Sequence, residues 1–241
     1  MKQSVGYVGK DLEAMSFAVN YHRWILASFA PYLGRRVVEV GAGTGSFSEL
    51  LLEQQPQSLS LVEPSASMFA QLSENVQQRF GSVDCQLYNE TFDRVAAQIR
   101  ARQQPDSIVY VNVLEHTADD ENEIRVIGDT LGPGGRVFIF VPALSWLYGS
   151  FDREINHYRR YSRADLERKC RAAGFRILES RYFDLLGVLP WWLKYRVLQS
   201  NKMEPGAVRF YDRRVVPLAR RVEALVAPPL GKNILLVAEK L

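Results

Sequence analysis

The stretch that decides the fold is Val37-Val38-Glu39-Val40-Gly41-Ala42-Gly43-Thr44-Gly45, an apolar run that stops at three glycines on alternate positions. The apolar residues are typical of a buried parallel strand, and the glycines permit a tight turn whose backbone can approach a ligand closely. The next residues, Ser46 to Leu52, have the composition of a helix start. Strand, glycine turn and helix together predict the first unit of a doubly wound nucleotide-binding fold.

The glycine spacing disfavours NAD as the ligand. A dinucleotide fingerprint would place its third glycine at Ser46, whereas this chain has it one residue earlier, at Gly45. About 20 residues further on, a second apolar run ends in Glu63-Pro64, and an acid at this distance commonly accepts hydrogen bonds from ribose hydroxyls. We therefore expect a nucleoside-containing ligand with Glu63 on its ribose.

Composition is that of one compact α/β enzyme. The chain has 241 residues, of which 47% are hydrophobic and 24% charged, so it is neither disordered nor membrane-spanning in composition. No signal core and no apolar run of about 18 residues is present, which predicts a cytoplasmic protein that is soluble or at most peripheral. Cys85 and Cys170 lack closely spaced partners, so we expect reduced thiols, with no disulfide and no metal.

Apolar runs alternate with amphipathic segments along the chain. This pattern predicts strands over residues 37–40, 58–62, 84–88, 107–113, 136–141, 176–182 and 233–240. It predicts helices over residues 11–32, 46–52, 65–80, 93–102, 121–131, 163–173 and 213–225.

Four motifs in order carry a family resemblance. They are Glu39-Val40-Gly41-Ala42-Gly43-Thr44-Gly45, Val62-Glu63-Pro64, Asn112-Val113-Leu114-Glu115-His116 and Leu131-Gly132-Pro133-Gly134-Gly135. Together they resemble the signature of class I S-adenosylmethionine (SAM)-dependent methyltransferases. The resemblance implies an α/β fold with a Rossmann-like, seven-stranded, mostly parallel sheet, helices on both faces and an antiparallel last pair of strands. We expect a single domain that comprises an N-terminal helical cap (1–34), a cofactor-binding core (35–182), a substrate-side insertion (183–232) and a last strand (233–241).

The resemblance further implies SAM as cofactor, S-adenosylhomocysteine as product and no metal. The candidate cofactor-binding residues are Tyr21, Glu39, Gly41, Ala42, Gly43, Glu63, Pro64, Met68, Asn89, Glu90, Thr91, Asn112 and Val113. Asn89, Glu90 and Thr91 follow the third strand, where the family contacts the adenine edge, and the sequence leaves open which of them does so. Met68 packs either on the adenine or in the core, and Tyr21 either over the cofactor or against the sheet.

Residues 148–162 form a second cluster, rich in aromatic and basic side chains, after the strand that ends at Val141. Its end resembles the Asp-x-x-x-Gly-His-Tyr-Arg-Arg-Tyr element of a bacterial methyltransferase subgroup whose genes often neighbour glycosyltransferases acting on lipid-linked sugars. Asn156 stands where that subgroup has glycine. The candidate substrate-binding residues are Tyr148, Asp152, Arg159, Arg160, Tyr161, Trp191 and Trp192.

His116 and His157 are the candidate catalytic residues. Imidazole suits a general base that removes a proton from the acceptor as the methyl group moves. The alternative is that both histidines hydrogen-bond loop backbone, because methyl transfer from a sulfonium gains most of its rate from alignment. Asp152 either orients His157 or pairs with Arg159 or Arg160.

The expected function is transfer of a methyl group from SAM to a small-molecule or lipid-linked acceptor. Basic residues near Trp191 and Trp192 suit a phosphorylated apolar acceptor or contact with an anionic membrane surface. The net charge of +3 is too small to indicate nucleic acid as a partner. The alternatives are a non-catalytic SAM-binding sensor or scaffold, an RNA methyltransferase and, third, a nicotinamide oxidoreductase. The acceptor atom and the oligomeric state stay open.

Overall fold

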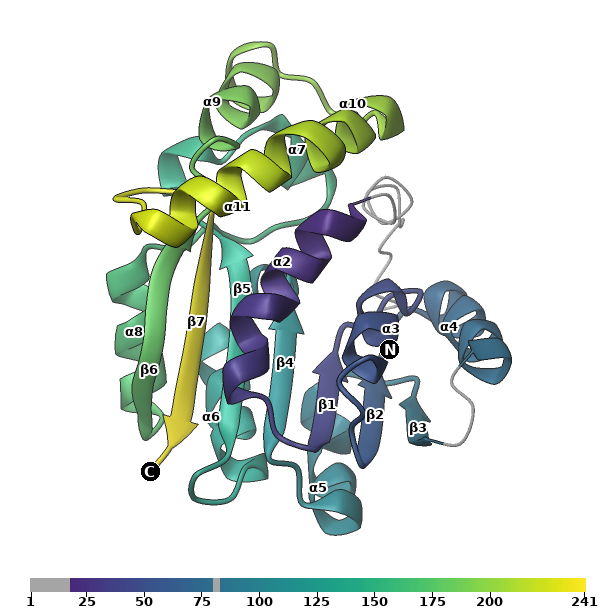
Figure 1. The fold of residues 1–241 in the computed structure, drawn as a ribbon. Helices are drawn as coiled ribbons and strands as arrows, with labels where there is room; N and C mark the ends of the chain where they lie inside the picture. Colours follow the sequence, from purple (N-terminus) through teal and green to yellow (C-terminus); the bar gives the residue numbers. More distant parts are fainter. Residues whose placement is uncertain (1–17, 80–82) are drawn as a thin grey trace.

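The computed structural model describes residues 18–79 and 83–241, and their strands form one seven-stranded sheet (Figure 1). The strand order is β3-β2-β1-β4-β5-β7-β6. The strands are β1 (Arg36–Val40), β2 (Ser58–Val62), β3 (Asp84–Tyr88), β4 (Ser107–Val111), β5 (Arg136–Pro142), β6 (Phe175–Phe183) and β7 (Asn233–Lys240). Strands β1 to β5 pair in parallel, and β7 lies antiparallel between β5 and β6. The expected fold class is confirmed.

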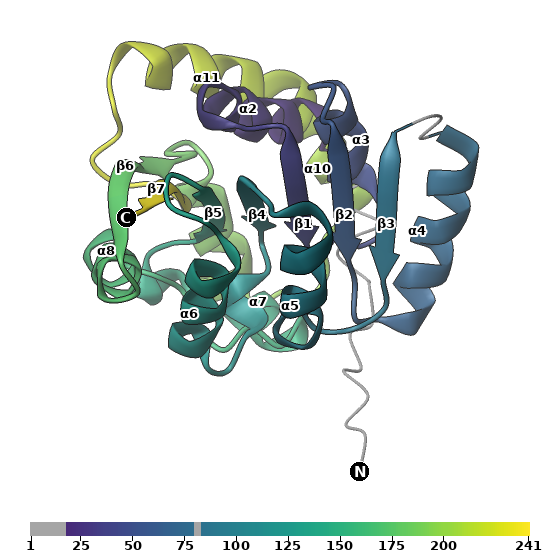
Figure 2. The same cartoon turned by 90° about the horizontal axis from the view of Figure 1, so that it is seen from below.

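Helices cover both faces of the sheet, which is why the central strands are apolar on both sides. Helices α5 (Phe92–Gln103), α6 (Asp120–Thr130) and α8 (Arg163–Ala172) pack into one core. Helices α2 (Val19–Phe29), α3 (Ser46–Leu52), α4 (Ala66–Arg79) and α11 (Val216–Leu225) contribute to the other. Figure 2 looks along the sheet from below and shows α2 and α11 opposite α5 and α6.

The predicted N-terminal helix is shorter in its described part. Helix α2 ends at Phe29 and continues as a 3₁₀ turn over Ala30–Tyr32, while residues 11–17 of the prediction lie outside the described residues. Trp24 stacks at 3.9 Å on Phe183, and Phe29 contacts Phe138 edge-on at 5.2 Å. Helix α2 is therefore held on the sheet by aromatic contacts.

The chain between β6 and β7 folds over the carboxyl ends of the parallel strands (Figure 1). This insertion, residues 184–232, contains α9 (Val188–Trp191), α10 (Pro205–Phe210) and α11. A π-helical turn over Trp192–Val197 extends α9, and another over Tyr211–Val215 joins α10 to α11. The helix predicted over 213–225 thus begins earlier, because Pro205 occupies the first helical position, where a proline costs nothing.

The return of the insertion to β7 requires glycine at position 231. A Cβ atom placed on Gly231 would lie 2.4 Å from the backbone oxygen and 2.6 Å from the backbone nitrogen of Phe183. Gly206 in α10 offers a matched control, because a Cβ atom there meets nothing within 4 Å.

We predict that Gly231→Ala lowers the free energy of unfolding by about 1–3 kcal/mol, since backbone cannot yield to the added methyl group. Gly206→Ala should leave stability equal or raise it by up to about 1 kcal/mol, because alanine favours the helix. Urea unfolding followed by circular dichroism measures both. Equal stability of Gly231→Ala and wild type would contradict this account of the junction.

Candidate functional site

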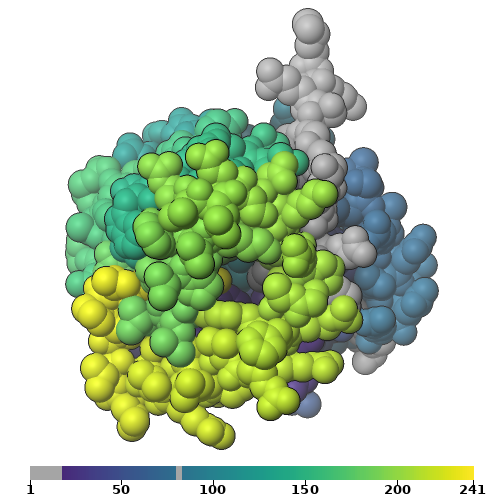
Figure 3. Space-filling model, turned by 90° about the horizontal axis from the view of Figure 1, so that it is seen from above, coloured from purple at the N-terminus to yellow at the C-terminus, as the bar shows by residue number. Residues whose placement is uncertain are grey.

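The carboxyl ends of β1, β2 and β4 open into a cavity of about 650 Å³. It lies where the sheet order reverses, with β2 and β3 on one side of β1 and β4 and β5 on the other. Doubly wound sheets bind ligands at such a point. The insertion covers the cavity, and Figure 3 shows this face of the molecule hollowed between the green residues near α9 and the yellow-green residues of α10 and α11.

The glycine loop after β1 forms one wall. Gly41, Gly43 and Gly45 all have positive φ angles, of 71°, 57° and 93°. A Cβ atom on Gly41 would lie 2.3 Å from Cγ2 of Val113, so the loop passes directly against the chain that follows β4. Backbone conformation therefore favours glycine at all three positions, and Gly41 is required by close approach as well.

Glu63 joins the end of β2 to this loop. Its carboxylate accepts hydrogen bonds from the backbone N–H of Gly43 at 2.9 Å and of Ser65 at 2.8 Å. Burial raises the pKa of Glu63, while these two N–H donors act in the opposite direction. A carboxylate that is fixed at the cavity wall by backbone donors keeps acceptor capacity for a ligand.

Glu39 lies near the end of β1, the strand that precedes the glycine loop, and is the second buried acid of this wall. It accepts a hydrogen bond from the hydroxyl of Ser48, and only 3% of its surface is exposed. Burial raises its pKa to about 8, and the nearby charge of Glu63 adds to the shift. Glu39 is therefore protonated at neutral pH, next to a carboxylate that is stabilised by backbone donors.

The structure places most of the cofactor candidates on the cavity wall. The lining residues among them are Tyr21, Glu39, Gly41, Ala42, Gly43, Glu63, Pro64, Met68, Thr91, Asn112 and Val113. Asn89 and Glu90 are not among them: the Asn89 amide donates to the backbone oxygen of Glu63, and Glu90 pairs with Arg94 at the surface. Of the three residues that follow β3, only Thr91 therefore faces the cavity.

Asp152 organises the opposite end of the cavity. The carboxylate contacts Nδ1 of His157 at 3.0 Å and accepts from Nε of Arg160 at 2.9 Å. It also accepts from the backbone N–H of Gly149 at 2.9 Å. Burial alone would raise the pKa of Asp152, but the hydrogen bond from His157 and the charge of Arg160 lower it by more. Asp152 thus both orients His157 and pairs with Arg160, and its contact with Arg159 is excluded because Arg159 pairs with Asp120 at 2.8 Å.

Glu115 lines the cavity but was not among the predicted site residues, although it belongs to the motif at residues 112–116. It lies in a 3₁₀ turn (Leu114–His116) after β4, is fully buried, and has one carboxylate oxygen 3.8 Å from Nε2 of His157. Burial raises its pKa to about 7, and the charge of His157 opposes that rise. The signal in the sequence was its position directly after the central strand.

His116 and His157 lie together, although they are far apart in the chain. Their ring centroids are 4.6 Å apart in an edge-on arrangement. Burial lowers the pKa of His116 to about 3, with a further contribution from His157, while a hydrogen bond to the backbone of Asn156 opposes the shift. Asn156 has a φ angle of 59°, a conformation that asparagine tolerates, so it forms the left-handed turn for which glycine is otherwise suited.

The structure brings only part of the predicted substrate-binding set to the cavity. Arg160 and Trp191 line it, and the guanidinium of Arg160 stacks over the Trp191 ring at 4.7 Å. The other five candidates do not line it. Asp152 lies behind His157, and the Tyr148 hydroxyl donates to the backbone oxygen of His157. The Tyr161 hydroxyl shares its proton between the backbone oxygen of Leu114 and the carboxylate of Asp120, Arg159 pairs with Asp120, and Trp192 is 39% exposed. The polar atoms of the first four residues therefore bind other protein groups, and Trp192 lies at the surface.

The insertion supplies cavity residues that the sequence did not indicate. Lys194, Tyr195, Tyr211 and Asp212 are among them. Asp212 also accepts from the backbone N–H of Tyr21 at 2.8 Å, so the insertion caps the amino end of α2. A helix pattern alone does not reveal a carboxylate that caps another helix.

Comparison with known proteins identifies the domain. A family model described as a methyltransferase domain matches residues 18–180. No curated protein sequence matches the chain.

Among solved structures, the chain is similar to a chain of the complex between the Haloferax volcanii Trm112 methyltransferase activator and a methyltransferase. The TM-score is 0.61 at 15% identity, over 99% of both chains. It is also similar to the glycopeptide N-methyltransferase MtfA in complex with SAM, with a TM-score of 0.58 and 12% identity over 93% and 94% of the chains. The [4+2]-cyclase SpnF has a TM-score of 0.57 at 18% identity, over 92% of this chain and 80% of its own. Likeness at this level of identity shows the fold.

We predict that Glu39→Gln makes stability less dependent on pH. Between pH 4.5 and 8 the folded chain keeps a proton on Glu39 that the unfolded chain loses, so wild type should lose up to about 5 kcal/mol of unfolding free energy through this group. Glutamine preserves the shape of the protonated acid and cannot ionise. Urea unfolding at several pH values tests this: wild type should lose stability relative to the variant as pH rises, and a difference that stays constant would contradict the prediction.

Proposed function

Since the chain belongs to the family of methyltransferase domains, we propose that it transfers a methyl group from SAM to a small-molecule or lipid-linked acceptor. SAM is the cofactor of this enzyme. The observation that carries the proposal is a single cavity, which joins the glycine loop and Glu63 at one end to His116, His157 and Arg160 at the other.

The donor end suits SAM group by group. Glu63 is a fixed acceptor for the ribose hydroxyls, and the backbone of the loop from Gly41 to Gly43 meets the amino acid end. Met68 and Thr91 lie where the adenine would extend, beyond β2 and β3. Asn112, with a φ angle of 54°, exposes the chain after β4 beside the sulfonium. SAM bound in this way would have its methyl group on the side of the acceptor end.

The acceptor end holds polar groups within an apolar enclosure. His157 and Arg160 stand beside Phe151, Trp191 and Tyr195. An acceptor that has both an apolar part and a polar group would match this lining. Alignment of its nucleophilic atom with the S–CH₃ bond supplies most of the catalysis; the sulfur keeps the electron pair and leaves as S-adenosylhomocysteine.

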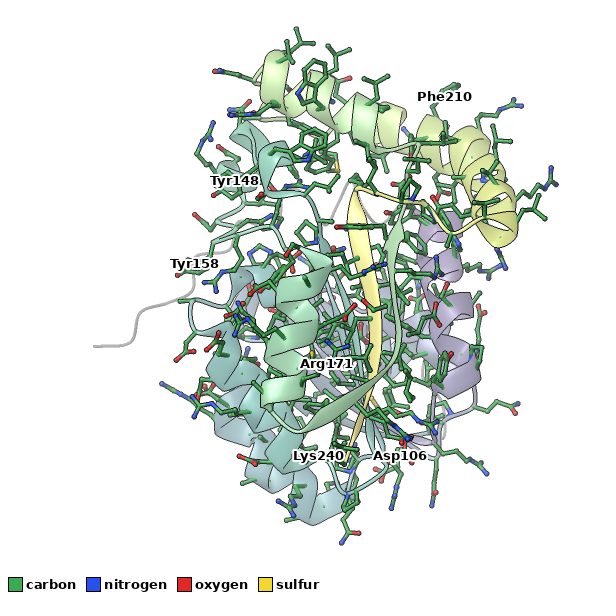
Figure 4. The ribbon with its side chains drawn as sticks, turned by 90° about the vertical axis from the view of Figure 1, so that its left-hand side faces the viewer. Asp106, Tyr148, Tyr158, Arg171, Phe210 and Lys240 are labelled. Carbon is green, nitrogen blue, oxygen red and sulfur yellow. The ribbon has the colours of Figure 1, made fainter. Side chains whose placement is uncertain are left out.

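The outer surface of the insertion supports a lipid-linked acceptor. Twelve of the sixteen exposed large hydrophobic residues that are described belong to it: Leu186, Leu189, Trp192, Leu193, Val197, Leu198, Phe210, Leu218, Val222, Leu225, Val226 and Leu230. Figure 4 shows Phe210 pointing outward from α10. The insertion also has nine lysines and arginines against four acidic residues, a larger positive excess than the +3 of the whole chain. Apolar and basic side chains together match the surface of an anionic bilayer.

This surface would lie against the membrane without crossing it. None of the described helices is long and apolar enough to cross a membrane. An RNA acceptor is less compatible with this surface, because exposed leucines and valines are interspersed among its arginines. A non-catalytic SAM-binding role is disfavoured by the buried polar groups at the acceptor end, which such a role would leave without use.

We predict that Glu63→Gln raises the dissociation constant for SAM by about 10-fold or more, since hydrogen bonds to a charged group are worth about 1.5–3 kcal/mol. Glu90→Gln is the matched control, because Glu90 lies outside the cavity and should leave affinity unchanged. Isothermal calorimetry with SAM, S-adenosylhomocysteine and NAD measures this. If the wild type bound neither SAM nor S-adenosylhomocysteine, the proposed function would be overturned. Normal SAM affinity of a folded Glu63→Gln variant would show that Glu63 does not bind the ribose.

We also predict that the chain sediments with vesicles that contain anionic lipid and that added salt weakens this binding. The double variant Arg213→Glu, Arg214→Glu and the single variant Phe210→Ser should both bind less. A control with the same charge change on α5, Arg94→Glu with Arg102→Glu, should bind like wild type. Equal binding by all variants, or none by wild type, would argue for a soluble acceptor.

A further inference from the structure

Glu115 is the most unusual buried group near the cavity. Its side chain is fully buried, and neither carboxylate oxygen has a hydrogen-bond partner among the described residues. Burying a carboxylate without donors is costly, and native structures satisfy such groups with hydrogen bonds, an ion pair or a metal ion. Among the described residues, Nε2 of His157 comes closest to compensating the charge of Glu115. Its distance of 3.8 Å is beyond hydrogen-bonding distance.

His157 directs its Nε2 toward Glu115, where this nitrogen can act as a metal ligand. Its Nδ1 contacts the Asp152 carboxylate at 3.0 Å, and that carboxylate is held by Arg160 and by the backbone of Gly149. An ionised carboxylate can only accept, so Nδ1 of His157 donates to Asp152, and Nε2 is the ring nitrogen that faces Glu115. A carboxylate behind a histidine is the usual support of a metal-binding imidazole.

His116 is oriented in a similar way from the other side. One of its ring nitrogens hydrogen-bonds the backbone of Asn156, whose left-handed conformation directs the loop toward it. The rings of His116 and His157 meet edge-on at 4.6 Å. One potential ligand atom from each of Glu115, His116 and His157 lies within 4.8 Å of the other two.

We propose that Glu115, His116 and His157 bind one divalent first-row transition-metal ion at the acceptor end of the cavity. Ligands at about 2.1 Å from a common ion lie roughly 3 to 4 Å apart, so ligand atoms within 4.8 Å of one another would need to approach by up to about 1–2 Å. Two imidazole nitrogens and one carboxylate oxygen favour ions such as Zn²⁺, Mn²⁺ or Fe²⁺ over Mg²⁺ and Ca²⁺, which prefer oxygen ligands alone. No metal site is evident in the sequence, because the two histidines are distant in the chain.

All three ligand residues line the cavity, so an ion held by them would be accessible to an acceptor in the cavity. This consequence rests on the proposed function and deepens it: the acceptor would present a hydroxyl oxygen. Coordination to such an ion would lower the pKa of that hydroxyl, and its proton would pass to solvent. The oxygen would then form a bond to the methyl carbon as the C–S bond breaks, with the sulfur retaining the electron pair.

The test is titration of the tag-free, chelator-treated full chain with CoCl₂, followed by visible absorption and calorimetry. We expect one equivalent to bind, with d–d bands that indicate nitrogen and oxygen ligands. Glu115→Gln, His116→Asn and His157→Asn should each weaken binding by about 10-fold or more, and Asp152→Asn should weaken it through His157. His22→Asn is the matched control: it changes the chain's third histidine, which packs on Phe47, and should leave Co²⁺ affinity unchanged.

The absence of stoichiometric Co²⁺ binding by wild type would overturn the proposal, as would unchanged affinity in Glu115→Gln. Calorimetry with SAM checks that each variant is folded, because the donor end is formed by other residues. Methyl transfer by a chain that binds no metal would instead indicate His157 as general base. Metal binding together with failure to bind SAM would refute the proposed function and leave the metal site standing.

Discussion

The pair of hydrogen bonds that Glu63 accepts from Gly43 and Ser65 is the interaction on which the cavity depends. It fixes the loop after β1 to the chain after β2 across the top of the sheet. Gly41 in this loop cannot be replaced by a residue with a side chain, because it lies against Val113 and has a positive φ angle. Three strand ends are thereby set at fixed distances from one another, and every other cavity group is placed relative to them.

Much of the fold could be predicted from the sequence, because its signals are local. The central parallel strands β4 and β5 are buried and appear as uninterrupted apolar runs. The bounds of β2, of the edge strand β3 and of the antiparallel β7 also agree with the predicted residues. Errors occur where tertiary contacts decide. The helix before β7 begins at Pro205, earlier than predicted, and its first turns contact the core through Val208 and Tyr211.

The site was less predictable for the same reason. A glycine motif and an acid after a strand mark the donor end within the sequence itself, so Glu63 could be selected in advance. At the acceptor end, aromatic and basic residues look alike whether they face a ligand or the protein. Tyr161 and Arg159 both bind Asp120, a residue on α6 that no local pattern connects to them. Glu115 was overlooked because its burial depends on how the segment around His157 folds over it.

The π-helical turn over Tyr211–Val215 shows how the insertion serves two demands at once. Adjacent side chains of a helix point in directions about 100° apart, so neighbouring residues contact different partners. Here Tyr211 hydrogen-bonds Asp184 at the start of the insertion, while Asp212 caps α2 on the other side. The widened turn shifts the following residues, and Val216 and Ala219 of α11 still pack in the core. π-Helical turns are rare and are frequently found at functional sites. Through Tyr211 and Asp212, this turn connects the cover of the cavity both to the start of the insertion and to α2 on the sheet.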